Sequence, residues 1–227
     1  MCGTYAFRKA PREVRALLRE HWRPIDIPDD AWRPSYKIKP TQTAPVLVGH
    51  STPAIAKQRW GLLPHWMQER GKAQINAKAE TVAEKPMFRD AMRKSRCIVL
   101  ADGFYEPTGQ TQPRPWYFFQ DEGESLMGFA GIYTFSELNT VDSASFAILT
   151  TRPSKDVALV HDRMPVILPM DDWETWLNQD LSPPALEQFY QPEVSPRLES
   201  WPVPDDAKKA SEPDGPNCIE VFNRTGI

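Results

Sequence analysis

The sequence predicts an α+β protein with a single domain over residues 1–227. Short apolar or aromatic runs of strand length recur along the chain, and turn-forming residues separate them. A few stretches instead repeat their apolar residues every three to four positions, as amphipathic helices do. A chain of 227 residues with eight Trp, ten Phe and six Tyr can fill one sizeable core, so nothing requires a second domain.

The expected elements follow from these patterns in chain order. The chain begins with an alternating, strand-like segment, and Pro11 then opens a helix whose apolar side chains recur up to Trp22. Strands are expected at residues 4–7, 44–48, 97–101, 116–119, 126–133, 145–151 and 166–168. Helices are expected at residues 11–22, 87–94 and 153–159, and around Trp173, Trp176 and Leu177.

Two regions carry more specific expectations. Strand 116–119, the turn residues 121–124 and strand 126–133 have the pattern of a β-hairpin. The proline-rich segment from about residue 183 onward predicts an irregular tail that ends in a β-compatible stretch at residues 219–222.

Composition narrows the functional class. No apolar run approaches the roughly 20 residues that cross a bilayer, and charged residues from Arg8 to Arg15 interrupt any secretory signal pattern, so a cytoplasmic protein is expected. The three cysteines, Cys2, Cys97 and Cys218, have neither zinc-ligand spacing nor the pattern of a disulfide framework. The net charge is −3, so contact with nucleic acid would need a local basic face.

Cys2 carries the most specific chemistry in the chain. If Met1 is removed, Cys2 presents a thiol and a free α-amine on adjacent carbons, which is a 1,2-aminothiol. The two groups have ordinary pKa values of roughly 8 and about 8.5, so modest tuning would activate either. The alternative is that Cys2 is simply a small residue after the start codon.

Three further segments hold candidate functional residues. The stretch 58–67 has two Trp on a Gly- and Pro-interrupted segment, which suits a stacking platform for bases or, alternatively, a lid over the core. Glu106 follows the buried strand 97–101 beside two aromatics, which would raise its pKa toward that of a general acid or base; a surface Glu is the alternative. His161 lies among charged residues directly before an apolar strand, and a catalytic or a structural histidine fits equally.

Five motifs in a fixed order give these features a common interpretation. They are Met1-Cys2-Gly3, Trp60-Gly-x-x-Pro-x-Trp66, Ile75-Asn76-Ala-x-x-Glu80-Thr81, Ala101-Asp-Gly-Phe-Tyr-Glu106 and His161-Asp-Arg-Met-Pro165. From Cys2 to about Trp176 the chain resembles the SRAP family, named for SOS-response-associated peptidase. The resemblance implies a curved, partly closed mixed β-sheet barrel flanked by helices. It also implies shielding of abasic sites in single-stranded DNA by covalent crosslinking.

The resemblance further implies roles for four residues in the chemistry. Cys2 would be the nucleophile that forms a thiazolidine with the ring-opened deoxyribose aldehyde. Glu106 would act as acid or base, and His161 would assist proton transfer and hold the opened sugar. Asn76 would hydrogen-bond near Cys2.

Three more residues would contact DNA on the same grounds. Trp66 would stack on or beside a base next to the lesion, while Lys78 and Arg163 would contact phosphates. The expected partner is single-stranded DNA with abasic sites, bound by a monomer that uses no metal and no cofactor. Two other functions remain open: a thiol peptidase or amidohydrolase with Cys2 as its N-terminal nucleophile, and a non-catalytic module that binds single-stranded DNA.

Overall fold

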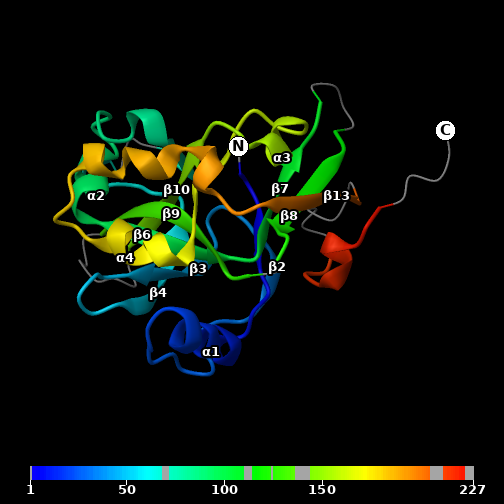
Figure 1. The fold of residues 1–227 in the computed structure, drawn as a ribbon, viewed down its shortest axis with the longest axis horizontal. Coiled ribbons are helices and arrows are strands. Elements are labelled where there is room, and N and C mark those ends of the chain that lie inside the picture. The colour runs from blue at the N-terminus through cyan, green and yellow to red at the C-terminus, as the bar shows by residue number, and fades with distance from the viewer. Residues whose placement is uncertain are drawn as a thin grey trace.

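The centre of the fold is a closed five-stranded β-barrel (Figure 1). The computed structural model describes residues 2–67, 72–109, 114–123, 125–135, 144–204 and 212–222. The barrel strands are β3 (Thr43–Val48), β4 (Ala54–Trp60), β6 (Arg96–Ala101), β9 (Met127–Thr134) and β10 (Ser145–Thr151). Pairing runs β4-β3-β6-β9-β10 and closes between β10 and β4. Only the closing pair is parallel, so the barrel is mixed, as the resemblance implied.

Three short strands extend the barrel sheet. They are β5 (Asn76–Lys78), which runs parallel to β10, and β11 (Met164–Pro165) and β12 (Ile167–Leu168), which pair antiparallel with β10 and β9. Because β5 and β11 both lie against β10, they bring together two motifs that are far apart in the sequence.

A second sheet of five antiparallel strands lies beside the barrel (Figure 1). Its order is β13-β8-β7-β1-β2. The strands are β1 (Tyr5–Phe7), β2 (Ser35–Ile38), β7 (Gly103–Pro107), β8 (Trp116–Asp121) and β13 (Leu198–Val203). Aromatic contacts join this sheet to the barrel, since the Tyr5 ring lies edge-on to Trp60 at 5.2 Å and to Phe129 at 6.0 Å between centroids.

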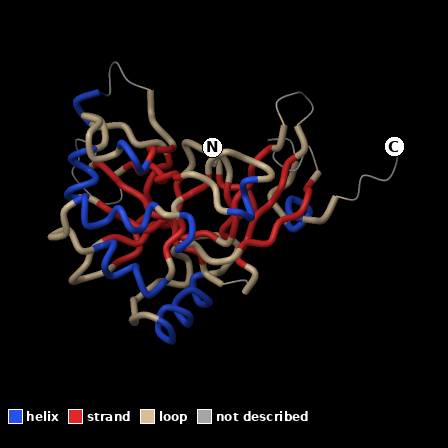
Figure 2. Tube along the Cα trace, turned by 45° about the horizontal axis from the view of Figure 1, so that its top comes forward, coloured by secondary structure: helices blue, strands red, loops and turns tan. Residues whose placement is uncertain are grey.

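Short helices surround the strands (Figure 2). The α-helices are α1 (Pro11–His21), α2 (Arg89–Lys94), α3 (Lys155–Ala158) and α4 (Trp173–Leu177). The 3₁₀ helices are η1 (His65–Met67), η2 (Ala79–Thr81), η4 (Met170–Asp172), η5 (Pro183–Tyr190), η6 (Pro192–Val194) and η7 (Pro216–Ile219). In the part of the chain that the structure covers, no helix has the length and apolar character needed to span a bilayer.

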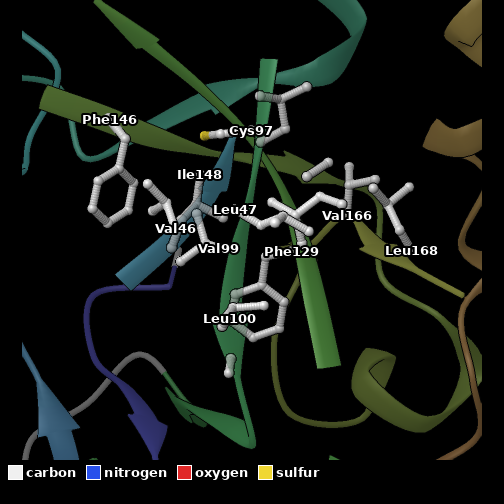
Figure 3. Close-up of a cluster of buried hydrophobic side chains, with 14 of the residues drawn as sticks. Val46, Leu47, Cys97, Val99, Leu100, Phe129, Phe146, Ile148, Val166 and Leu168 are labelled. Atoms are coloured by element: carbon white, nitrogen blue, oxygen red, sulfur yellow. The ribbon is translucent and has the colours of Figure 1, made fainter. Parts of the chain in front are cut away.

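The core is continuous around the barrel strands (Figure 3). Side chains from β3, β6, β9 and β10 meet there, among them Val46, Val99, Phe129 and Ile148. All six residues of β6 are buried because helices α2 and α4 also pack against this strand. The predicted α+β class, with its curved barrel and flanking helices, is therefore confirmed.

The predicted hairpin between strands 116–119 and 126–133 is wrong. β8 pairs with β7 and β13 in the second sheet, whereas β9 pairs with β6, β10 and β12 in the barrel sheet. The turn between them passes the chain from one sheet to the other. Local alternation identifies both strands, but it carries no information about the partner of each strand.

The predicted irregular tail is also corrected. Beyond residue 183 the chain forms η5 and η6, and then β13, which pairs along its whole length with β8. The stretch 219–222 is not a strand, because η7 occupies 216–219 and the Trp201 indole donates to the Ile219 carbonyl at 2.7 Å. The prolines that suggested an irregular segment are compatible with 3₁₀ turns and with this edge strand.

Candidate active site

Cys2 lies at the start of the chain, between the second sheet and β5. Its side chain is completely buried, and its carbonyl accepts a hydrogen bond from Asn76 Nδ2 at 2.8 Å. Asn76 begins β5, so the pairing of β5 with β10 holds this amide in place. Asn76 Oδ1 is buried and has no hydrogen-bond partner among the described residues, which leaves an acceptor beside Cys2.

The β1–β7 pairing brings Cys2 toward Glu106. Tyr5 is opposite Phe104, and the Tyr105 N–H donates to the Thr4 carbonyl at 3.1 Å. Continuing this antiparallel register places Gly3 opposite Glu106, and Cys2 is the next residue. Glu106 follows strand β6 as expected, but it lies inside a further strand, β7, which the sequence did not predict.

Glu106 is fully buried and faces His161. Its Oε2 is 3.5 Å from His161 Nε2, and the carboxylate side chain is 1% exposed against 18% for the imidazole. A buried carboxyl beside a partly exposed imidazole forms a pair that can exchange a proton with a bound substrate. Among Cys2, Glu106 and His161, only the histidine reaches the surface.

His161 is held by the backbone that follows it. Nδ1 is 3.0 Å from the Arg163 N–H, which donates to it, and 3.1 Å from the Arg163 carbonyl. Nδ1 therefore has a partner in either protonation state, and Nε2 is directed at Glu106 in both. Loss of hydration lowers the pKa of His161 below its usual value, in spite of the nearby Asp162 carboxylate, so the neutral ring is favoured.

A surface hollow of about 700 Å³ opens beside His161. Its walls come from the end of β7 and from the loop after α3, and include Thr108, Arg114 and Leu159. Leu159 is 90% exposed. Because His161 itself lines this hollow, a substrate bound there would lie next to the imidazole.

The three predicted DNA contacts have different surroundings. Trp66 is 59% exposed in η1, and Lys78 is exposed at the end of β5. Arg163 instead forms a two-pronged ion pair with Glu80, Nη1 to Oε1 at 2.7 Å and Nη2 to Oε2 at 2.9 Å. The structure places Lys78 and Arg163 beside the same residue of β10, Thr150, but it shows no contact between either of them and Trp66.

Two residues in this region had no role in the sequence interpretation. Glu80 belongs to the Ile75–Thr81 motif, yet only the structure reveals its ion pair with Arg163. Asp102 precedes β7 and is buried against Arg8 and Lys9. In each case the sequence showed an acidic residue within a motif, but it did not show the ion pair, because the basic partner is distant in the sequence.

The other cysteines are structural. Cys97 lies in the core strand β6 and Cys218 in η7, and both are buried free thiols. Burial strongly raises the pKa of the Cys97 thiol, so this side chain stays protonated. Cys2 is thus distinguished from them by its neighbours Asn76 and Glu106.

Comparison with known proteins identifies the family of this chain. The family described as SOS response associated peptidase (SRAP) matches residues 1–210. The chain belongs to this family. Among relatives of this SRAP protein, abasic site processing protein YoqW of Bacillus subtilis is 34% identical over 189 residues, which cover 78% of this chain and 82% of YoqW. Abasic site processing protein HMCES of Xenopus tropicalis is 30% identical over 216 residues, covering 76% of this chain and 64% of HMCES.

Solved structures support the fold of the SRAP protein. A protein from Bacteroides thetaiotaomicron superposes with a TM-score of 0.80 at 23% identity, covering 98% of this chain and 100% of the other. A phage-related protein from Bordetella bronchiseptica gives a TM-score of 0.69 at 24% identity over 89% of this chain and 94% of the other. At these identities the likeness concerns the fold alone.

Proposed function

We propose that this SRAP protein processes abasic sites in single-stranded DNA by crosslinking covalently to them through Cys2 once Met1 has been removed. The observation that carries the proposal is the hydrogen bond from Asn76 to the Cys2 carbonyl, together with the β1–β7 pairing whose register runs from Cys2 toward Glu106 and the 3.5 Å approach of Glu106 to His161. The names of the relatives YoqW and HMCES, which are called abasic site processing proteins, supply the substrate.

The chemistry begins with the opened sugar. An abasic deoxyribose is in equilibrium between a closed hemiacetal and an open aldehyde, and opening moves a proton from the C1 hydroxyl to the ring oxygen. Glu106 and His161 are placed to accept and return that proton. The hollow beside His161 admits the sugar, and the burial of Glu106 keeps its proton transfer away from bulk water.

Crosslinking then takes two bond-forming steps. The α-amine of Cys2 adds to C1, and the resulting carbinolamine loses water to give an imine, with a protonated acid assisting departure of the hydroxyl. The thiol of Cys2 adds to the imine carbon, and its proton ends on nitrogen. The net reaction joins one aldehyde and one aminothiol into a thiazolidine and releases one water. With Met1 attached, the nitrogen would be an amide and could not form the imine.

The test is incubation with single-stranded DNA that contains one abasic site, followed by denaturing electrophoresis and intact-mass measurement. We expect an adduct whose mass is protein without Met1 plus DNA minus one water. Cys2→Ala should give no stable adduct, although its α-amine can still form an imine that borohydride traps. Cys218→Ala, which removes the buried thiol of η7, is the matched control.

Two companion assays, with a peptide substrate and with intact DNA, separate the alternatives. Release of cleaved product from a peptide substrate, abolished in Cys2→Ala, would replace the proposal with a thiol peptidase, an activity that the family description names. Equal retention of intact and abasic DNA, with no adduct, would leave only a DNA-binding module.

A further inference from the structure

Arg163 is already engaged by other groups of the protein. Its two terminal nitrogens bind both oxygens of Glu80, at 2.7 and 2.9 Å, and Nη2 also donates to the Thr150 carbonyl. The arginine side chain is 16% exposed, and the glutamate is 46% exposed. Although partial burial alone would raise the pKa of Glu80, the hydrogen bonds and charge of Arg163 lower it, so the carboxylate stays ionised. A two-pronged pair of this kind fixes orientation as well as distance.

The backbone of Arg163 holds the ring of His161. Its N–H and its carbonyl both lie within 3.1 Å of Nδ1. The side chain that Glu80 clamps therefore belongs to the residue whose backbone directs Nε2 toward Glu106. Movement of Arg163 would move the imidazole.

Glu80 also lies next to the segment that contacts Cys2. It is in η2, which directly follows β5, and β5 begins with Asn76. Asn76 donates to the Cys2 carbonyl, so one end of this short segment contacts Cys2 and the other end contacts Arg163. The contacts therefore form a continuous path. It runs from Cys2 to Asn76, along the chain to Glu80, across the ion pair to Arg163 and on to the imidazole of His161. The imidazole faces Glu106 in β7, the strand that pairs with β1.

We propose that Glu80 is a positioning residue. Through Arg163 it fixes the orientation of His161 relative to Glu106, and it connects the His161 loop to the segment that contacts Cys2. This inference rests on the proposed function for its effect on rate, but not for its effect on the imidazole. It gives Arg163 a task in the free protein that differs from the phosphate contact implied by the family resemblance.

The decisive variant is Glu80→Gln, which keeps the shape of the side chain and removes its charge. Glu84→Gln is the matched control, because Glu84 is an exposed glutamate four residues further on that forms no ion pair with the described residues. Binding is measured with DNA carrying a tetrahydrofuran site, which lacks an aldehyde, and the adduct-forming rate is measured with abasic DNA at saturation. We expect Glu80→Gln to reduce the saturated rate by about tenfold while the dissociation constant stays at the wild-type value.

A second measurement needs no reaction. The ring nitrogens of His161 are observed by ¹⁵N NMR in the free protein, where we expect Glu80→Gln to change their chemical shifts and Glu84→Gln to leave them alone. Glu80→Asp keeps the charge on a shorter side chain and should fall between wild type and Glu80→Gln in both measurements. Partial rescue of this kind separates positioning from general loss of folding.

The outcomes are distinguishable. Tighter DNA binding by Glu80→Gln, with unchanged saturated rate and unchanged His161 signals, would overturn the inference and show that Glu80 merely restrains a phosphate-binding arginine. Absence of an adduct with the wild-type protein would refute the proposed crosslinking. The NMR comparison would still decide the role of Glu80 in that event.

Discussion

Two buried carboxylates four residues apart on one stretch of chain have contrasting surroundings. Asp102, directly before β7, accepts a hydrogen bond from Lys9 Nζ at 2.7 Å and others from the backbone N–H groups of Arg8 and Lys9. Glu106, near the end of β7, faces the imidazole of His161 at 3.5 Å. Both carboxylate side chains are 1% exposed, so burial alone does not distinguish them.

The difference lies in the partners. Asp102 pairs with the cationic side chains of Arg8 and Lys9 and accepts hydrogen bonds from their backbone N–H groups, so it anchors the end of β1, the strand that follows Cys2. Glu106 faces a group that changes its protonation near neutral pH, so this pair can pass a proton. We therefore expect one carboxylate to serve the fold and the other the chemistry. Four predictions test and extend this comparison.

The largest effect is expected from Glu106→Gln. Loss of a positioned acid or base typically costs 10²–10⁴-fold in rate, so adduct formation at saturating abasic DNA should slow by about 100-fold or more. Binding to tetrahydrofuran DNA should stay at the wild-type level because Glu106 is buried behind His161. Single-turnover gel kinetics measure the rate, and fluorescence anisotropy measures the affinity. Equal losses in rate and affinity would contradict this division of roles.

Asp102→Asn should have the opposite effect: it should lower stability and leave the rate of adduct formation nearly unchanged. It removes the charge that pairs with Lys9 and weakens the hydrogen bonds to two backbone N–H groups, for an expected loss of about 2–3 kcal/mol in the free energy of unfolding. The saturated rate should change little below the unfolding transition. Urea denaturation measures the loss, with exposed Asp180→Asn as a control expected to stay within about 0.5 kcal/mol. If the Asp102→Asn variant is as stable as the wild type but forms adducts slowly, Asp102 takes part in the reaction and the assigned structural role is wrong.

The contrast between these residues shows what the sequence can predict. The apolar runs identified four of the five barrel strands, whereas β4 (Ala54–Trp60) was missed. The order of motifs selected Cys2, Asn76, Glu106 and His161, which the structure connects through backbone pairing and short contacts. Their catalytic roles stay predictions. The sequence could identify these residues because the reactive group of each lies within a recognisable motif.

Pairings between distant segments could not be predicted from the sequence in this way. The sequence around Asp102 does not indicate that it pairs with Arg8 and Lys9, and the sequence around Glu80 does not indicate its ion pair with Arg163. The same limit explains the wrong hairpin and the missed strand β13, since β8 pairs with the preceding strand β7 and with the distant strand β13, and not with β9. Strand partners and ion pairs depend on the tertiary fold, which local periodicity does not specify.

Trp66→Ala extends the comparison to the surface. Stacking of a base on an aromatic ring contributes about 1–3 kcal/mol, so the dissociation constant for single-stranded DNA should rise about fivefold or more. The saturated rate should not change, because no described contact joins Trp66 to Glu106 or His161. Val221→Ala is a suitable control, since both side chains are 59% exposed, and anisotropy titration provides the measurement. An unchanged dissociation constant would remove Trp66 from the DNA-binding surface.

The smallest expected effect concerns the proton on His161. Loss of hydration lowers its pKa in the folded protein, so its titration midpoint should lie below the ordinary value of about 6.5. As pH falls through that value, the unfolded chain binds the proton before the folded chain does, and stability is lost until the folded group is also protonated. The substitution His161→Asn should remove this part of the pH dependence. NMR titration of the imidazole and urea unfolding between pH 7 and pH 5 provide the test.

A midpoint above the ordinary value would contradict this prediction. It would mean that the Glu106 and Asp162 carboxylates outweigh desolvation, and that the free protein holds an imidazolium that can donate a proton.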